Sequence, residues 1–116
     1  MGLKCTNSSN KLRKLWSEFS IQERIDHLQR FIIVNSYIYY ECNNNVISDR
    51  EYDAKAKELV EYKNNYPDLW KSSMYYKQFG DDYNGSTGFT LFHDLDERQQ
   101  RIILSIVYGQ LNVRRE

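Results

Sequence analysis

The sequence predicts a small all-α domain built on an antiparallel helical hairpin, with an N-terminal helical arm and an extra C-terminal helix. Apolar residues recur three and four positions apart along most of the chain, as on a buried helix face. Ser20 with Glu23, and Ser48 with Glu51, have capping-box spacing and so mark two helix starts. About half a dozen residues connect these two helices, a length typical of antiparallel neighbours.

Composition limits the function classes that need to be considered. The 116 residues fit a single domain, 1–116, and its 16 basic and 16 acidic side chains cancel, so direct nucleic-acid binding is not expected. The two cysteines, Cys5 and Cys42, are too few for a disulfide framework and lack zinc-site spacing. The chain shows neither a secretory signal nor an apolar run of about 18 residues. We therefore expect a cytoplasmic protein without membrane or metal binding, whose oligomeric state is open.

The arm, residues 1–19, is expected to form a short helix after Ser8 or Ser9. Its apolar side chains fall on one stripe that could dock on the rest of the domain: Leu12, Leu15, Trp16 and Phe19.

The first helix of the hairpin is predicted to begin at Ser20. Its expected buried stripe contains Ile25, Leu28, Ile32 and Tyr39, with Phe31 and Ile38 beside it. The β-branched run FIIV would suit a strand, but the cap and the length of the pattern favour a helix. Asparagines 43–45 are expected to end it, since asparagine tolerates the left-handed conformation.

The second helix of the hairpin is predicted to follow Ser48 and to end near Tyr66 and Pro67. Its expected buried stripe is Tyr52, Ala56, Leu59 and Val60.

The last segment, 81–116, is predicted to be a glycine-rich loop followed by a helix over 97–108, which Gly109 would cap. Its expected buried residues are Ile102, Ile103, Ile106 and Val107. Before it, Phe89, Leu91 and Phe92 could be extended or could pack as a knot. His93, Asp94 and Asp96 could suggest a metal site, but a structural role is favoured because Asp94 and Glu97 have capping spacing.

The candidate site lies where the hairpin turns. Asp49, Tyr52 and Asp53 share one face of the second helix, and Tyr39 and Tyr40 lie across the loop. Aromatic faces attract a delocalised cation and carboxylates accept hydrogen bonds from sugar hydroxyls, so the group suits a flat, cationic, hydroxyl-bearing ligand. A purely structural explanation competes with this one, because helix N-termini favour acids and tyrosines at helical spacing often pack in a core.

The run YY, a short loop, ISDREYD and then KELVEYKNNYPDL resembles domain Ia of bacterial NAD-dependent DNA ligases, over about residues 20–80. The resemblance implies that the chain grips the nicotinamide mononucleotide half of NAD. Tyr39 and Tyr52 would flank the nicotinamide ring, while Tyr40, Asp49 and Asp53 would bond the ribose, carboxamide or phosphate. The family's reactive lysine stands in a KxDG motif, which this sequence lacks. We therefore expect a stand-alone, non-catalytic copy of the module.

Three hypotheses follow for the function. The first is a binding module for nicotinamide mononucleotide, NAD or a related ligand. The second is a small phage or mobile-element protein, acting in the host cytoplasm, that binds and inhibits a host or defence protein as an anti-CRISPR-type inhibitor would. The third, a nucleotide hydrolase with Asp49 or Asp53 as base, is the weakest because no nucleophile, metal cluster or second catalytic group assists.

Overall fold

The computed structural model describes residues 20–115 except for 43, 45 and 86–89. This part of the chain contains five α-helices and one short 3-10 helix, and no strand occurs in it. The all-α prediction is therefore confirmed, while the predicted arm lies outside the described residues. Among these residues, no helix combines the length and the apolar character that crossing a membrane requires.

Helix α2, Ile21–Glu41, begins at the predicted cap. The Ser20 hydroxyl accepts a hydrogen bond from the Glu23 backbone N–H at 3.1 Å, and the Glu23 carboxylate accepts one from the Ser20 N–H at 3.0 Å. Both halves of the capping box are present, so two otherwise unpaired donors of the first turn are satisfied. The FIIV run lies inside this helix, as predicted.

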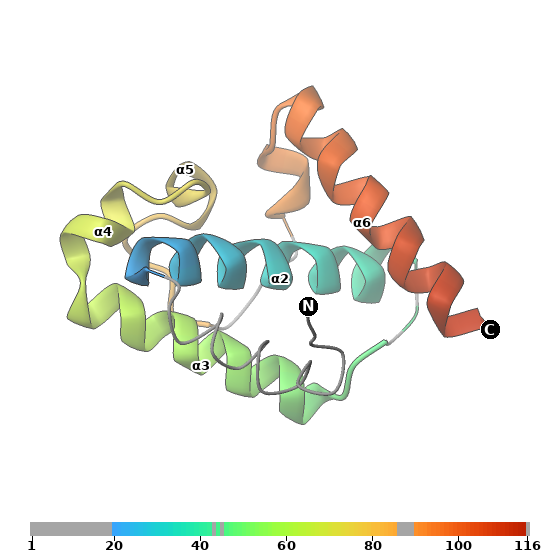
Figure 1. Ribbon diagram of the computed structural model, residues 1–116, viewed down its shortest axis with the longest axis horizontal. Coiled ribbons are helices and arrows are strands. Elements are labelled where there is room, and N and C mark those ends of the chain that lie inside the picture. The colour runs from blue at the N-terminus through green and yellow to red at the C-terminus, as the bar shows by residue number, and fades with distance from the viewer. Residues whose placement is uncertain (1–19, 43, 45, 86–89, 116) are drawn as a thin grey trace, which may run out of the picture.

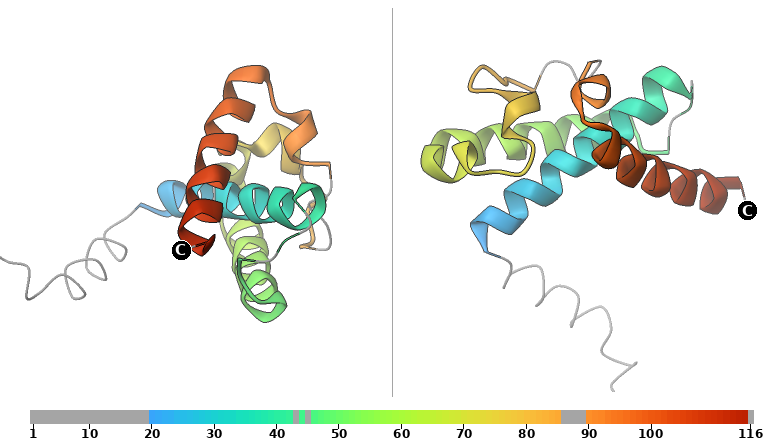
Figure 2. Two further views of the ribbon diagram at one scale, coloured as in Figure 1. Left: turned by 90° about the vertical axis from the view of Figure 1, so that its right-hand side faces the viewer. Right: turned by 90° about the horizontal axis from the view of Figure 1, so that it is seen from above.

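Other parts of the chain surround the central turns of α2 on every side. Its residues 32–36 are all buried, and five consecutive residues span more than one 3.6-residue turn. Figures 1 and 2 show α3 along one side of α2 and α6 crossing it near its C-terminal half. One detail of the predicted stripe was wrong: Ile38 is buried, whereas Tyr39 is 51% exposed.

Helix α3, Asp49–Asn65, runs antiparallel to α2 as predicted (Figure 1). The Ser48 hydroxyl accepts a hydrogen bond from the Glu51 N–H at 3.0 Å. Ala56 and Leu59 are buried against α2, and Tyr52 and Val60 are half-buried beside them. Helix α2 ends with Cys42 as its C-cap, and two of the three asparagines predicted to end it lie outside the described residues.

Two short helices, α4 over Pro67–Lys71 and α5 over Tyr76–Phe79, follow α3 at the end of the molecule where α2 begins (Figure 1). Pro67 is at the start of α4, where its missing N–H is not needed. The turn between them is bonded to Gln29 of α2, which is fully buried. The Gln29 side-chain amide donates to the Ser73 hydroxyl at 2.8 Å, and its oxygen accepts from the Tyr75 N–H at 3.1 Å.

An aromatic cluster secures the chain after α5. The Trp70 ring stacks on Tyr83 with centroids 6.1 Å apart and meets Phe79 edge-on at 6.0 Å. The Trp70 indole N–H donates to the Gly80 carbonyl at 3.0 Å. The buried indole therefore has a partner for its only polar group, as a core tryptophan requires.

The C-terminal helix α6, Glu97–Arg115, packs on α2 and completes the core with Ile103 and Val107. It extends past Gly109, so the prediction that this glycine ends the helix was wrong. Ile102, predicted to be buried, is 43% exposed. The Asp96 carboxylate, not Asp94, caps α6 by accepting from the Gln99 N–H at 2.8 Å.

Leu91 and Phe92, just before α6, are buried. Phe92 begins the 3-10 helix η2, Phe92–Asp94. Of the two predicted alternatives for this segment, the packed knot is therefore the one observed. Phe89 lies outside the described residues.

Two glycines provide a matched test of backbone conformation. Gly109 is inside α6 with open space where a Cβ would stand, so Gly109→Ala should raise the free energy of unfolding by about 0.5–1 kcal/mol. Gly80 has φ +73°, so Gly80→Ala should lower it by about 1–2 kcal/mol although nothing obstructs the added methyl. Urea titrations would measure both, and shifts of the same sign would contradict the assigned conformations.

Candidate functional site

The last turn of α2 and the first two turns of α3 carry all five residues predicted to form a binding site, here called the hairpin-end cluster: Tyr39, Tyr40, Asp49, Tyr52 and Asp53. The two α2 tyrosines are exposed, Tyr39 by 51% and Tyr40 by 45%. Their rings meet edge to face with centroids 4.9 Å apart. Both side chains can therefore be reached from the solvent.

The two carboxylates of the cluster are exposed on α3. Asp49 is the first residue of the helix and follows its serine cap, where an acidic side chain is favoured by the helix dipole. Asp53 follows one turn later, on the same face. Both can accept hydrogen bonds from the hydroxyl or amide donors of a ligand in exchange for water.

Tyr52 connects the two helices at the centre of the cluster. Its ring is half-buried, and its hydroxyl lies 2.7 Å from the hydroxyl of Ser36, a buried residue of α2. Burial raises the pKa of the Tyr52 hydroxyl, the Ser36 hydrogen bond lowers it, and nearby Tyr40 and Asp53 raise it further. The structure therefore holds the Tyr52 hydroxyl from the inside of the protein, through Ser36.

Ser36 is part of this arrangement, but the sequence analysis did not identify it as a site residue. The signal was available, because a buried polar side chain within an apolar run must find a hydrogen-bond partner. Ser36 occurs in the run FIIVNSYIYY, one turn before the two tyrosines.

Contacts from η2 hold the last turn of α2. The Tyr37 and Phe92 rings are 4.4 Å apart, and His93 Nε2 lies 3.2 Å from a Glu41 carboxylate oxygen. His93 thus pairs with α2, whereas Asp96 caps α6. Among the described residues there is no group of three or more metal-binding side chains.

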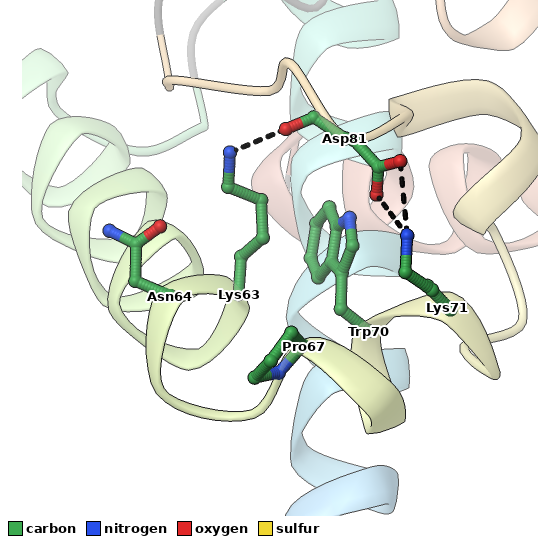
Figure 3. A pocket seen from close by; sticks show the side chains of 6 residues that line it. All are labelled: Lys63, Asn64, Pro67, Trp70, Lys71 and Asp81. Atoms are coloured by element: carbon green, nitrogen blue, oxygen red, sulfur yellow. Dashed lines mark hydrogen bonds and ion pairs between the residues drawn. The ribbon is translucent and has the colours of Figure 1, made fainter.

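A separate open pocket of about 230 Å³ lies at the other end of α3 (Figure 3), lined by Lys63, Asn64, Pro67, Trp70, Lys71 and Asp81. The Lys63 ammonium donates to the Asp81 carbonyl at 2.8 Å, and the Lys71 ammonium lies 3.2 Å from the Asp81 carboxylate. The Tyr76 hydroxyl and the Lys71 ammonium hold the pKa of Asp81 below its usual value. These groups tie the turn after α5 to α3 and α4, remote from the hairpin-end cluster.

Three aromatic residues that follow α4 belong to this same remote end. Tyr75 and Phe79 are buried in the core, and the Tyr76 hydroxyl donates to Asp81 at 2.8 Å.

Known proteins resemble the part of the chain that carries the hairpin-end cluster. Residues 18–73 match the family described as "DNA ligase-like, N-terminal NAD+-binding domain". A DNA ligase of Endomicrobium trichonymphae is 48% identical over 48 residues, which are 41% of this chain and 7% of that protein. A DNA ligase of Petrotoga mobilis is 44% identical over 50 residues, which are 43% of this chain and 8% of that protein.

A DNA ligase of Hydrogenobaculum sp. is 49% identical over 45 residues, which are 39% of this chain and 6% of that protein. The matched part of this chain thus spans less than a tenth of the length of each of these relatives. No solved structure matches. The hairpin-end cluster lies entirely inside residues 18–73, while α6 lies outside them.

Proposed function

We propose, from the premise that residues 18–73 resemble the N-terminal NAD+-binding domain of DNA ligase-like proteins, that this chain binds a nicotinamide nucleotide at its hairpin-end cluster. One observation carries the proposal. Tyr52, whose hydroxyl is held by the buried Ser36, belongs to the same end of the hairpin as the exposed Tyr40 and Asp53, within the region that the family match covers. This end of the hairpin therefore carries both the aromatic and the carboxylate groups that such a ligand would need.

Each member of the cluster has a role that its chemistry suits. Tyr39 and Tyr52 present aromatic faces to the positively charged nicotinamide ring, which a tyrosine face attracts. Asp49 and Asp53 accept hydrogen bonds from ribose hydroxyls, and the Tyr40 hydroxyl can donate to or accept from the ribose or the carboxamide. Tyr52 is the most constrained of the five, so it defines the position of the ring.

The proposed role is binding without catalysis. The match to ligases covers only their N-terminal NAD+-binding domain, and the sequence has no KxDG motif that could supply an adenylated lysine. The cluster contains carboxylates and phenols but no nucleophile paired with a base, which covalent catalysis would require. Binding would then sequester or report the nucleotide.

Isothermal titration with nicotinamide mononucleotide and with NAD tests this function. We expect binding that weakens about tenfold in Asp49→Asn and in Asp53→Asn, because hydrogen bonds to charged acceptors contribute about 1.5 kcal/mol or more. Asp68→Asn is the matched control, since Asp68 is also an exposed acid in the first turn of a helix, α4. The proposal is wrong if the folded wild type gives no heat at millimolar ligand.

Inhibition of a host or defence protein remains the alternative. The observation that favours it is the exposure of Ile102 and Tyr108 on α6, a helix outside the ligase-like region. In this case Ile102→Ser with Tyr108→Ser should abolish a stoichiometric protein complex, whereas Asp49→Asn and Asp53→Asn should leave it intact.

A further inference from the structure

We propose that the N-terminal arm folds back as a helix over about residues 9–19 and docks in the corner between α6 and the N-terminal half of α2. Phe31 of α2 and Ile102 and Ile106 of α6 line this surface, here called the α2–α6 corner. The corner is separate from the hairpin-end cluster, and the proposal does not rest on nucleotide binding.

The two flanks of α6 face different parts of α2. Helical spacing puts Ile102 and Ile106 on one side of the buried stripe of α6, and Tyr108 on the other side. Burial raises the pKa of the Tyr37 hydroxyl, and Tyr108 is among the nearby groups that raise it further. The Tyr108 flank therefore faces the last turns of α2. Because α6 crosses α2 (Figure 2), the flank with Ile102 and Ile106 faces the N-terminal half of α2.

Phe31 is on the side of α2 that α6 occupies. It comes two residues after Gln29, which is bonded to the turn between α4 and α5, so it lies on roughly the opposite side of the helix. Seen from above, α5 and α6 lie on opposite sides of α2 (Figure 2). Phe31 and Ile106 are half-buried, and Ile102 is 43% exposed. The described residues therefore cover this apolar corner only in part.

The arm is attached where it can reach the corner. The backbone of Ser20 is extended, with φ −63° and ψ 159°, so the residues before it leave the axis of α2. A helix over residues 9–19 spans about 16 Å, which is also about the distance along α2 from Ser20 to Phe31. An arm helix that turns back along α2 therefore ends beside Phe31.

The arm also has the side chains that such a contact requires. Its expected apolar stripe is Leu12, Leu15, Trp16 and Phe19. An isolated helix shorter than about 12–15 residues is only marginally stable in water, so the arm needs a surface to pack on. Removal of the stripe and of Ile102 from water would stabilise the docked state.

Other exposed apolar side chains in the described part of the chain suit the arm less well. Tyr39 is 18 residues beyond the start of α2, about 27 Å along the helix, and a 16 Å arm helix does not reach it. Met74 is exposed near the start of α2, but its sulfur accepts a hydrogen bond from Arg30. Tyr66 is exposed at the same end, but its ring packs 6.2 Å from that of Tyr62.

The proposed contact joins two parts of the chain that lie almost entirely outside the ligase-like region. Residues 1–17 precede the matched residues 18–73, and α6 follows them. Each would cover apolar surface of the other across α2. In the docked state Ile102 is covered, so a partner protein can use it only by displacing the arm.

Tryptophan fluorescence of the full chain tests the docking. Trp70→Phe leaves Trp16 as the only tryptophan. We expect its emission to be shifted to the blue, and its quenching by acrylamide to be several-fold weaker, relative to the same chain unfolded in urea. Emission and quenching equal to those of the unfolded chain would overturn the proposal and leave the corner open to a partner protein.

Two variants of α6 test the position of the arm. In the Trp70→Phe chain, Ile102→Ser should shift the Trp16 emission to the red because it removes an apolar contact of the arm. Tyr108→Ser is the matched control on the other flank of α6 and should leave the emission unchanged. No shift in Ile102→Ser, or equal shifts in both variants, would overturn the α2–α6 corner as the docking surface. Circular dichroism would show that both variants are folded.

Variants of the arm itself give a readout that leaves the described helices intact. Leu12→Ser should shift the Trp16 emission to the red, whereas Lys14→Ser, on the opposite face of the expected arm helix, should not. The losses in unfolding free energy from Leu12→Ser and Ile102→Ser should not add, because both remove the same contact. Additive losses would contradict it.

Dilution separates docking within one chain from docking between two chains. The emission of Trp16 should not depend on protein concentration if the arm folds back on its own chain. A red shift on dilution would mean that the arm of a second copy occupies the corner, and it would overturn the proposed folding back.

Discussion

Trp70→Ala is expected to lower the free energy of unfolding by about 3–5 kcal/mol, the usual effect of truncating a buried tryptophan. Trp70 is 1% exposed and contacts both Phe79 and Tyr83, so its removal leaves a cavity among aromatic rings. It also leaves the Gly80 carbonyl without its indole donor. Because a domain of this size is stable by only about 5–15 kcal/mol, much of that margin would disappear.

Urea unfolding followed by circular dichroism would measure this effect. Trp70→Phe is the control: it keeps an aromatic ring but loses the hydrogen bond to Gly80, so we expect a loss of about 1–2 kcal/mol. A loss below about 1 kcal/mol in Trp70→Ala would show that the cluster does not pack as described.

Tyr52→Ala is expected to weaken nicotinamide nucleotide binding by more than tenfold. It removes the aromatic ring whose hydroxyl is fixed from inside the protein by Ser36. Calorimetric titration would measure the affinity, and a matched melting curve would show that the variant is folded. An affinity within twofold of the wild type would exclude Tyr52 from the site.

The role of Ser36 in positioning Tyr52 is separable by a double-mutant cycle. Ser36→Ala and Tyr52→Phe each remove one partner of the 2.7 Å hydrogen bond, so their effects on ligand affinity should not add. Both variants keep the ring, and each should bind more tightly than Tyr52→Ala. Additive losses would mean that the two hydroxyls act independently.

Local signals in the sequence were sufficient for the hairpin. The capping box at Ser20 specifies where α2 begins, and the helical spacing of Ala56 and Leu59 specifies which side of α3 is buried. Because the loop between α2 and α3 is short, antiparallel packing is the simplest arrangement of these two helices. These features depend on neighbours within a few residues, which is why the sequence alone predicted them.

Features that depend on distant residues were not predictable in this way. Ile38 rather than Tyr39 is buried because the elements that pack on α2 leave one side of its last turn open, and the three-and-four spacing of apolar residues does not show which side that is. Gly109 continues α6 because a single glycine lowers helix stability by only about 1 kcal/mol, which the packing of Ile103 and Val107 on α2 exceeds.

Only part of the candidate site was predictable from the sequence. The spacing of Asp49, Tyr52 and Asp53 showed that they share a face, and the family resemblance supplied the proposed ligand. Ser36 was missed because its partner is 16 residues away, and only the packing of α3 on α2 reveals the pair.

The enclosure of α2 has a consequence for amide hydrogen exchange. Amides in its central turns can exchange only when the elements around them separate, so their exchange should report global unfolding rather than local opening. Ligand bound at the last turn stabilises only the folded state, and its free energy should therefore slow exchange in those central turns as well. A signal recorded in the middle of α2 would then measure occupancy of a site that it does not touch.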